Sequence, residues 1–189
     1  ATLLLPPAAR AAGPSPFTAA GAGRAPMLLA HRGVAQTFPS EGLTNETCTA
    51  SRITPPRHAL LENTIPSLRA AIQAGADVVE VDIHPTTDGE FAVFHDWTLE
   101  CRTNGHGRTR DHTLAELQAL DIGHGYTHDG GRSFPFRGKG GGLMPSLREV
   151  VQALPRQAIL VNVKSNDPAE GEQLAQTEVR DNGKLYSEM

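Results

Sequence analysis

The stretch VVEVDIHPTTDGEFAVFHD, residues 78–96, places acids and histidines at the ends of two apolar runs. The two runs are typical of strands, and the residues TTDG between them are typical of a turn. Because side chains alternate across a strand, Glu80, Asp82 and His84 are expected on one face. Burying carboxylates in a sheet is costly unless a cation pairs with them. The fold must therefore bring charge compensation to the ends of these strands.

Two further apolar runs become polar in the same way. The run MLLA at 27–30 is followed by His31, and AILVNVKS at 158–165 ends with Asn162 and Lys164 on one face. Parallel α/β sheets gather their functional residues at the carboxyl ends of the strands. The sequence therefore predicts that four strands deliver these residues to one rim: His31, Glu80, Asp82, His95, Asn162 and Lys164.

Helices are predicted between these strands, at 64–76, 113–120 and 146–154, and a last one at 167–183. Thr64 can cap the first helix, and capping boxes open the next two. After the last helix no further strand–helix unit is indicated. The order of the elements predicts an α/β protein with a mainly parallel sheet.

Size and composition limit the kinds of partner. A chain of 189 residues can form one domain with a sizeable core. The net charge of -4 gives no argument for nucleic acid as a partner, and no apolar run approaches a membrane span of about 18 residues. We expect a flexible N-terminal arm at 1–26 and the folded domain at 27–189. The run Leu3–Leu5 is compatible with the end of a secretory signal and with a gene-model boundary.

The polar residues also have structural interpretations. Glu80 and Asp82 could be ion-paired structural acids, and His95 with Asp96 could be an ordinary strand end. The remaining strand-end and loop histidines are interpreted as solvated: His84, His106, His112, His124 and His128. The convergence of several polar strand ends favours a functional rim over these separate explanations.

The order of five short motifs resembles the glycerophosphodiester phosphodiesterase family. These motifs are H-R-G at 31–33, E-N-T at 62–64, E-x-D at 80–82, T-x-D-G at 86–89 and H-D at 95–96. The resemblance implies a TIM barrel that hydrolyses glycerophosphodiesters to glycerol 3-phosphate and an alcohol. It also implies a divalent metal cofactor, Ca²⁺ or Mg²⁺.

The same resemblance implies roles for individual residues. His31 and His95 correspond to the acid/base pair, Glu80 and Asp82 to metal ligands, and Arg32 to the arginine that contacts phosphate. Glu62 lines the site in this comparison. One departure concerns the third metal ligand, which in the family is usually a glutamate in an E-x-K pattern. Here Asn162 takes that place and can offer a carbonyl oxygen to a hard cation, while Lys164 is expected to face the substrate phosphate.

A second departure is the length of the segment between the H-R-G and E-N-T motifs, which exceeds that usual in the family. We interpret this segment as a lid that shapes the substrate site. Spacing alone would favour free thiols for Cys48 and Cys101, but the resemblance puts both on the face that holds the site. It therefore favours a disulfide and an extracytoplasmic location, periplasmic or secreted; without the bond a cytoplasmic location is expected.

The third departure is size, because a complete (β/α)₈ barrel takes roughly 250 residues. We expect a TIM-barrel type fold that is truncated to about the first four strands, with Leu29, Val93 and Leu160 exposed on its inner face. Open edges of this kind favour self-association. Two alternatives to a glycerophosphodiesterase remain. One is a phospholipase D-like enzyme that acts on lysolipid headgroups, and the other is an inactive fragment that only binds or assembles.

Overall fold

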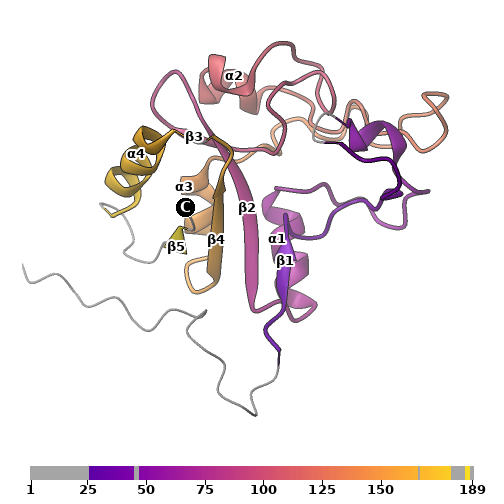
Figure 1. The fold of residues 1–189 in the computed structure, drawn as a ribbon. Coiled ribbons are helices and arrows are strands. Elements are labelled where there is room, and N and C mark those ends of the chain that lie inside the picture. The colour runs from indigo at the N-terminus through magenta and orange to yellow at the C-terminus, as the bar shows by residue number, and fades with distance from the viewer. Residues whose placement is uncertain (1–25, 45–46, 166, 180–185, 188–189) are drawn as a thin grey trace, which may run out of the picture.

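The computed structural model describes residues 26–44, 47–165, 167–179 and 186–187. Almost all of the predicted N-terminal arm lies outside these residues. Figure 1 shows a sheet in the centre of the molecule, with helices against it and long loops beyond one end of its strands. The strands are β1 (Leu29–His31), β2 (Val78–Pro85), β3 (Phe91–Val93), β4 (Ala158–Val163) and β5 (Tyr186–Ser187). The helices are α1 (Ile65–Gln73), α2 (Leu114–Gln118), α3 (Leu147–Ala153) and α4 (Pro168–Val179), with 3-10 turns at Thr49–Arg52 and Thr109–Asp111.

The parallel part of the sheet has the order β1-β2-β4-β5. The short strand β5 was not expected from the sequence, and it is the fourth parallel strand. Among the described strands β3 is the antiparallel one, paired with β2, so the sheet is mainly parallel, as predicted. The cause of the antiparallel pairing is the tight turn after β2, in which the N–H of Thr86 donates to the carbonyl of Glu90. Two strands joined by so short a turn can pair only as a hairpin.

The predicted helices are present, although residues 180–183 of the last one lie outside the described residues, and caps explain where α1, α2 and α3 begin. Thr64 accepts a hydrogen bond from the backbone N–H of Ser67 at the start of α1. The predicted capping boxes also form, between Thr113 and Glu116 at α2 and between Ser146 and Glu149 at α3. These bonds satisfy N–H groups that a helix leaves unpaired in its first turn.

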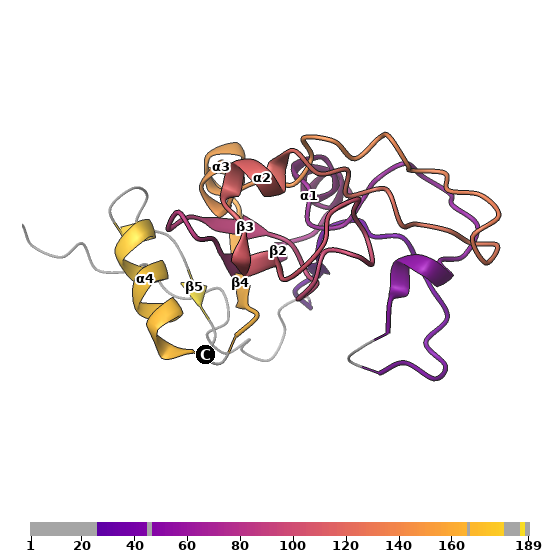
Figure 2. The ribbon, with the colours of Figure 1, turned by 90° about the horizontal axis from the view of Figure 1, so that it is seen from above.

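The two faces of the sheet differ in what covers them. Val79, Val81 and Ile83 of β2 point to the outer face and are buried against apolar residues of α1, α3 and α4. In Figure 2, α1 and α3 lie together on one side of the sheet. The inner face carries the alternate residues of each strand. Its polar groups are therefore concentrated on the side that these helices do not cover.

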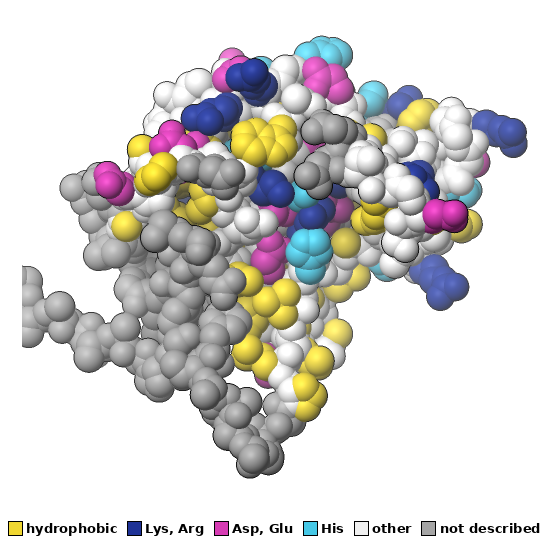
Figure 3. Space-filling model, in the orientation of Figure 1, with side chains coloured by type: hydrophobic (Ala, Val, Ile, Leu, Met, Phe, Trp, Pro, Cys, Tyr) yellow, Lys and Arg dark blue, Asp and Glu magenta, His cyan; other side chains and the backbone are white. Residues whose placement is uncertain are grey.

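The inner face remains open at β1, as the sequence suggested. Leu29 is 43% exposed there, and Leu160 on β4 is half-buried. Figure 3 shows apolar side chains on this side of the molecule, below a group of acidic, basic and histidine side chains. Val93 was predicted to be exposed as well, but it is buried because β3 packs under α3.

A second apolar cluster lies beyond the sheet and fixes the long loops. It includes Ala50 and Ile53 from the segment between β1 and α1, and Tyr126 and Phe136 from the segment after β3. The long segment is thus anchored by its own core, whereas its role as a lid stays a prediction. In the part of the chain that the structure describes, no helix is long and apolar enough to cross a membrane.

Candidate active site

Two buried carboxylates of β2 form the centre of the polar rim. Glu80 is 4% exposed and Asp82 is fully buried, and both belong to the inner face. The strand register places His31 of β1 opposite Glu80, and Asn162 of β4 opposite Asp82. Parallel pairing therefore brings together residues that lie about 50 and 80 positions apart in the chain.

Asp82 is surrounded by nitrogen donors. Its Oδ1 lies 2.9 Å from the Asn162 side-chain nitrogen and 3.6 Å from the Lys164 ammonium. Its Oδ2 lies 3.0 Å from the Asn63 side-chain nitrogen and 3.0 Å from Nε of Arg32. These contacts compensate the buried charge of Asp82.

The buried charge of Glu80 is less well compensated than that of Asp82. Its Oε2 accepts a hydrogen bond from the backbone N–H of Arg32 at 3.0 Å and lies 3.9 Å from Nε2 of His31. Burial, and next the neighbouring charge of Asp82, raise the pKa of Glu80 to about 7. Partial desolvation and the charge of Arg32 lower the pKa of His31. The rim thus contains one carboxylate whose negative charge is poorly balanced.

The turn after β1 aims Arg32 at the carboxylates. Arg32 has a φ of 59° and Asn63 a φ of 57°, both in the left-handed region. Such backbone costs about 1–3 kcal/mol and persists only when its surroundings hold it. The N–H of Asn63 donates to the carbonyl of Arg32, and Gly33 packs so closely on Ser67 that an added Cβ would lie 2.7 Å from its hydroxyl. The guanidinium then reaches both Asp82 and, at 3.0 Å, Glu62.

His95 reaches the rim by the return of the hairpin and not by the end of a parallel strand. Its Nδ1 lies 2.7 Å from Oδ1 of Asp96. Burial opposes ionisation of Asp96, but the hydrogen bond from His95 and the charge of Arg102 outweigh it and lower its pKa. An ionised carboxylate only accepts hydrogen bonds, so Nδ1 of His95 carries the proton and Nε2 is left for other partners.

The structure corrects one histidine and adds residues that the sequence did not indicate. His84 was interpreted as solvated, but it is buried, with its ring edge-on to Trp97 at 5.5 Å between centroids. Burial lowers its pKa to about 4, and its Nε2 donates to the carbonyl of His95 at 3.3 Å. Asn63 and Arg102 were missed as well. Asn63 belongs to the recognised E-N-T motif, whereas nothing near Arg102 in the sequence marks it as buried.

Comparison with known proteins decides the family. Residues 31–187 match the sequence model of the Glycerophosphoryl diester phosphodiesterase family. The chain belongs to this family. A glycerophosphodiester phosphodiesterase of Caldanaerobacter subterraneus is 37% identical over 103 residues, which are 54% of this chain and 39% of that protein. One from Bacillus subtilis is 35% identical over 114 residues, 58% of this chain and 38% of that protein. The chain therefore spans about two fifths of the length of these relatives.

Solved structures agree with the family fold. A glycerophosphodiester phosphodiesterase from Agrobacterium tumefaciens is 28% identical, with a TM-score of 0.53 over 86% of this chain and 58% of that chain. A phosphodiesterase from Oleispira antarctica, solved with its product sn-glycerol-3-phosphate, is 26% identical. Its TM-score is 0.55, over 86% of this chain and 56% of that chain. The sheet of four parallel strands thus corresponds to part of a TIM barrel of this family.

The family generally depends on a divalent metal, and the rim residues suit one in charge and in donor type. Glu80, Asp82 and Asn162 offer the oxygen ligands that Ca²⁺ and Mg²⁺ prefer. The raised pKa of Glu80 marks the place where a cation would relieve repulsion. Within the described residues no three His, Cys, Asp or Glu side chains surround a common point. Asn162 would therefore have to turn its amide oxygen inward as the third protein ligand.

Glu80 gives the first prediction, which concerns stability and pH. The folded protein holds the Glu80 proton more tightly than the unfolded chain does, because the pKa rises from 4.5 to about 7. The stabilising contribution of this group is therefore full below pH 4.5 and is lost as pH rises through 7. At pH 8, Glu80→Gln should be more stable than the parent by about 2 kcal/mol after allowance for solvent screening. At pH 4 the two should unfold at the same urea concentration.

Urea denaturation with and without millimolar Ca²⁺ completes this test. If Glu80 binds the cation, Ca²⁺ should stabilise the parent at pH 8 and leave Glu80→Gln unchanged. Glu41→Gln is the matched control, because it removes the same charge from an exposed site. Equal Ca²⁺ responses of the parent and Glu80→Gln would exclude Glu80 as a ligand.

Proposed function

We propose that this chain carries the catalytic rim of a metal-dependent glycerophosphodiester phosphodiesterase. The observation that supports it most directly is the convergence of His31, Arg32, Glu80 and Asp82 with His95 at one end of the sheet, in a chain that belongs to this family. The products would be glycerol 3-phosphate and an alcohol.

The chemistry follows from the types of group at the rim. The phosphodiester is anionic, and more negative charge develops on its oxygens in the transition state. Arg32 and Lys164 are the cations placed to face that charge. A divalent ion held by Glu80, Asp82 and Asn162 would supply further charge neutralisation when bound.

The two histidines would divide the proton transfers. One ring takes a proton from the attacking oxygen, either of water or of the substrate's glycerol hydroxyl, as that oxygen bonds to phosphorus. The other ring gives a proton to the alcohol oxygen as its bond to phosphorus breaks. For His95 the reactive atom is Nε2, because Nδ1 donates to Asp96.

The compartment is a further part of this proposal. Cys48 and Cys101 form the disulfide that the sequence suggested. Disulfides persist in oxidising surroundings and are rare in the reducing cytosol. We therefore propose a periplasmic or secreted location, which holds only if the bond is present in the protein as made by the cell.

The second prediction separates catalysis from assembly. The exposed inner face at Met27 and Leu29 favours a protein that associates through it. We expect the isolated chain to sediment as an oligomer or aggregate and to turn over glycerophosphocholine poorly. A fusion that continues the chain with the C-terminal part of the Caldanaerobacter relative, the completed fusion, should be monomeric and active, and EDTA should abolish its activity.

Three results would contradict parts of the proposed function or the expected association of the isolated chain. A monomeric isolated chain with robust turnover would show that four strands suffice. A well-folded monomeric fusion without hydrolysis would count against the proposed function and favour a binding or assembly role. Hydrolysis that resists EDTA would exclude the metal requirement.

A further inference from the structure

Arg102 is a buried cation that the proposed chemistry does not use. Its side chain is 3% exposed and lies in the segment after β3, next to the disulfide. The guanidinium meets two carboxylates, with Nη2 at 3.3 Å from Glu62 Oε1 and Nε at 3.3 Å from Asp96 Oδ2. Burying a cation so completely is costly unless it is paired, and these two ion pairs supply the compensating negative charge.

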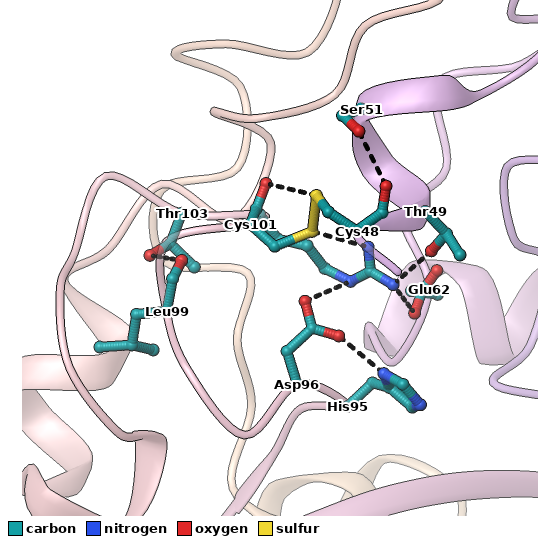
Figure 4. Close-up of a disulfide and its surroundings, with 10 residues drawn as sticks. Cys48, Thr49, Ser51, Glu62, His95, Asp96, Leu99, Cys101 and Thr103 are labelled. Atoms are coloured by element: carbon teal, nitrogen blue, oxygen red, sulfur yellow. Dashed lines mark hydrogen bonds and ion pairs between the residues drawn. A yellow bond between two sulfur atoms is a disulfide. The ribbon is translucent and has the colours of Figure 1, made fainter. Parts of the chain in front are cut away.

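Further contacts help to fix where this guanidinium lies. Nη2 also donates to the hydroxyl of Thr49 at 2.9 Å, and the carbon of the guanidinium is 5.6 Å from the centre of the Tyr126 ring. Thr49 follows Cys48 directly, so the disulfide and Arg102 join the same two loops. Figure 4 shows the disulfide with Thr49 and Glu62 on one side and Asp96 with His95 close by.

Each carboxylate that Arg102 holds has a second partner at the rim. Oδ2 of Asp96 forms the ion pair with Arg102. Oδ1 of Asp96 accepts a hydrogen bond from Nδ1 of His95 at 2.7 Å. Glu62 Oε1 forms an ion pair with Nη2 of Arg102 at 3.3 Å and accepts a hydrogen bond from Nη1 of Arg32 at 3.0 Å. The ion pair at Oδ2 and the hydrogen bond at Oδ1 together orient the Asp96 carboxylate. A single buried arginine is thus linked through one carboxylate to each of two rim residues.

We propose that Arg102 is a positioning residue, which holds Asp96 so that His95 keeps its proton on Nδ1, and holds Glu62 so that Arg32 faces Asp82. The expected effect of Arg102 on turnover rests on the proposed function, whereas the expected effect of Arg102 on the protonation of His95 does not. Groups that orient a reactive side chain in this way typically change activity by 10- to 100-fold when they are removed.

The decisive measurement is the protonation site of His95 in the completed fusion. Nitrogen NMR of protein labelled with ¹⁵N-histidine distinguishes an Nδ1–H ring from an Nε2–H ring, and His95→Gln identifies the signal. The parent should show the Nδ1–H form, while Arg102→Gln should show a mixture with substantial Nε2–H. Thr49→Val is the matched control. It removes a neutral hydrogen bond from the same guanidinium and leaves both ion pairs, so its His95 signal should match the parent.

Retention of the disulfide and of the far-UV dichroism verifies folding. If Arg102→Gln fails to fold, Arg102→Lys keeps the charge but cannot span both carboxylates, and it should show the same mixture. A His95 signal like that of the parent in whichever folded variant is measured would overturn the proposal.

Turnover separates this inference from the proposed function. In an active fusion, Arg102→Gln should lower kcat by about 10- to 100-fold, beyond any change that Thr49→Val causes. A changed tautomer in a fusion that hydrolyses no glycerophosphodiester would support the positioning role and refute the function. Normal turnover by Arg102→Gln with an unchanged His95 tautomer would refute the positioning role and would not contradict the proposed function.

Discussion

Replacing His95 with alanine in the completed fusion should lower kcat for glycerophosphocholine by about 10²- to 10⁴-fold, the range typical of a lost general acid or base. The ring is the group whose Nε2 is left available by the bond to Asp96. His31→Ala should have an effect of similar size. The substrate would still bind through Arg32 and Lys164, so KM should change much less than kcat.

The double variant tests whether the two rings act together. Groups that act as a unit give non-additive losses, so His31→Ala/His95→Ala should be scarcely slower than the slower single variant. His106→Ala is the matched control, because this histidine is exposed and its hydrogen bond with His112 uses the backbone carbonyl, which alanine keeps. Normal turnover by His95→Ala would refute the assignment.

Removing the disulfide should cost the largest single increment of stability. The Cys48–Cys101 bond closes a loop with a sequence separation of 53. For a loop of this length, the chain-entropy model gives about 4 kcal/mol, because the bond restricts the unfolded chain. Cys48→Ala/Cys101→Ala should therefore unfold at a clearly lower urea concentration than the oxidised parent.

The reduced parent provides the control for this measurement. It has the same open loop without the change of side chains, so it should resemble the double variant. Mass spectrometry of a non-reduced digest should show the peptides of Cys48 and Cys101 linked. Two freely alkylated thiols in the protein as made by the cell would remove the bond and, with it, the argument for an extracytoplasmic compartment.

The alternation of side chains along β2 follows from the sequence alone, because it depends only on the two-residue period of a strand. That period places Glu80 and Asp82 on one face with His84, and the structure agrees. The same period does not predict that His84 is buried. Its burial depends on Trp97, which packs against it only after the hairpin has brought the chain back.

The direction of β3 shows how a short turn can change the assignment of a strand. The composition of residues 90–96 predicts a strand correctly, and the sequence also places His95 near its end. Whether the strand runs parallel depends on the connection. Only residues 86–90 separate it from β2, too few for a crossover of a dozen or more residues. His95 consequently reaches the rim from a strand that runs antiparallel to β2.

The sequence by itself determined strands β1 to β4, the helix caps, the motif residues and the pair of cysteines, because these depend on local periodicity and on residue types at short spacing. Only the tertiary structure decided that Arg102 lies between Glu62 and Asp96, and that Asn63 binds Asp82. The physical reason is that a buried charge is satisfied by whichever partner the register and the loops place within about 3 Å, and such partners have no fixed spacing in the chain.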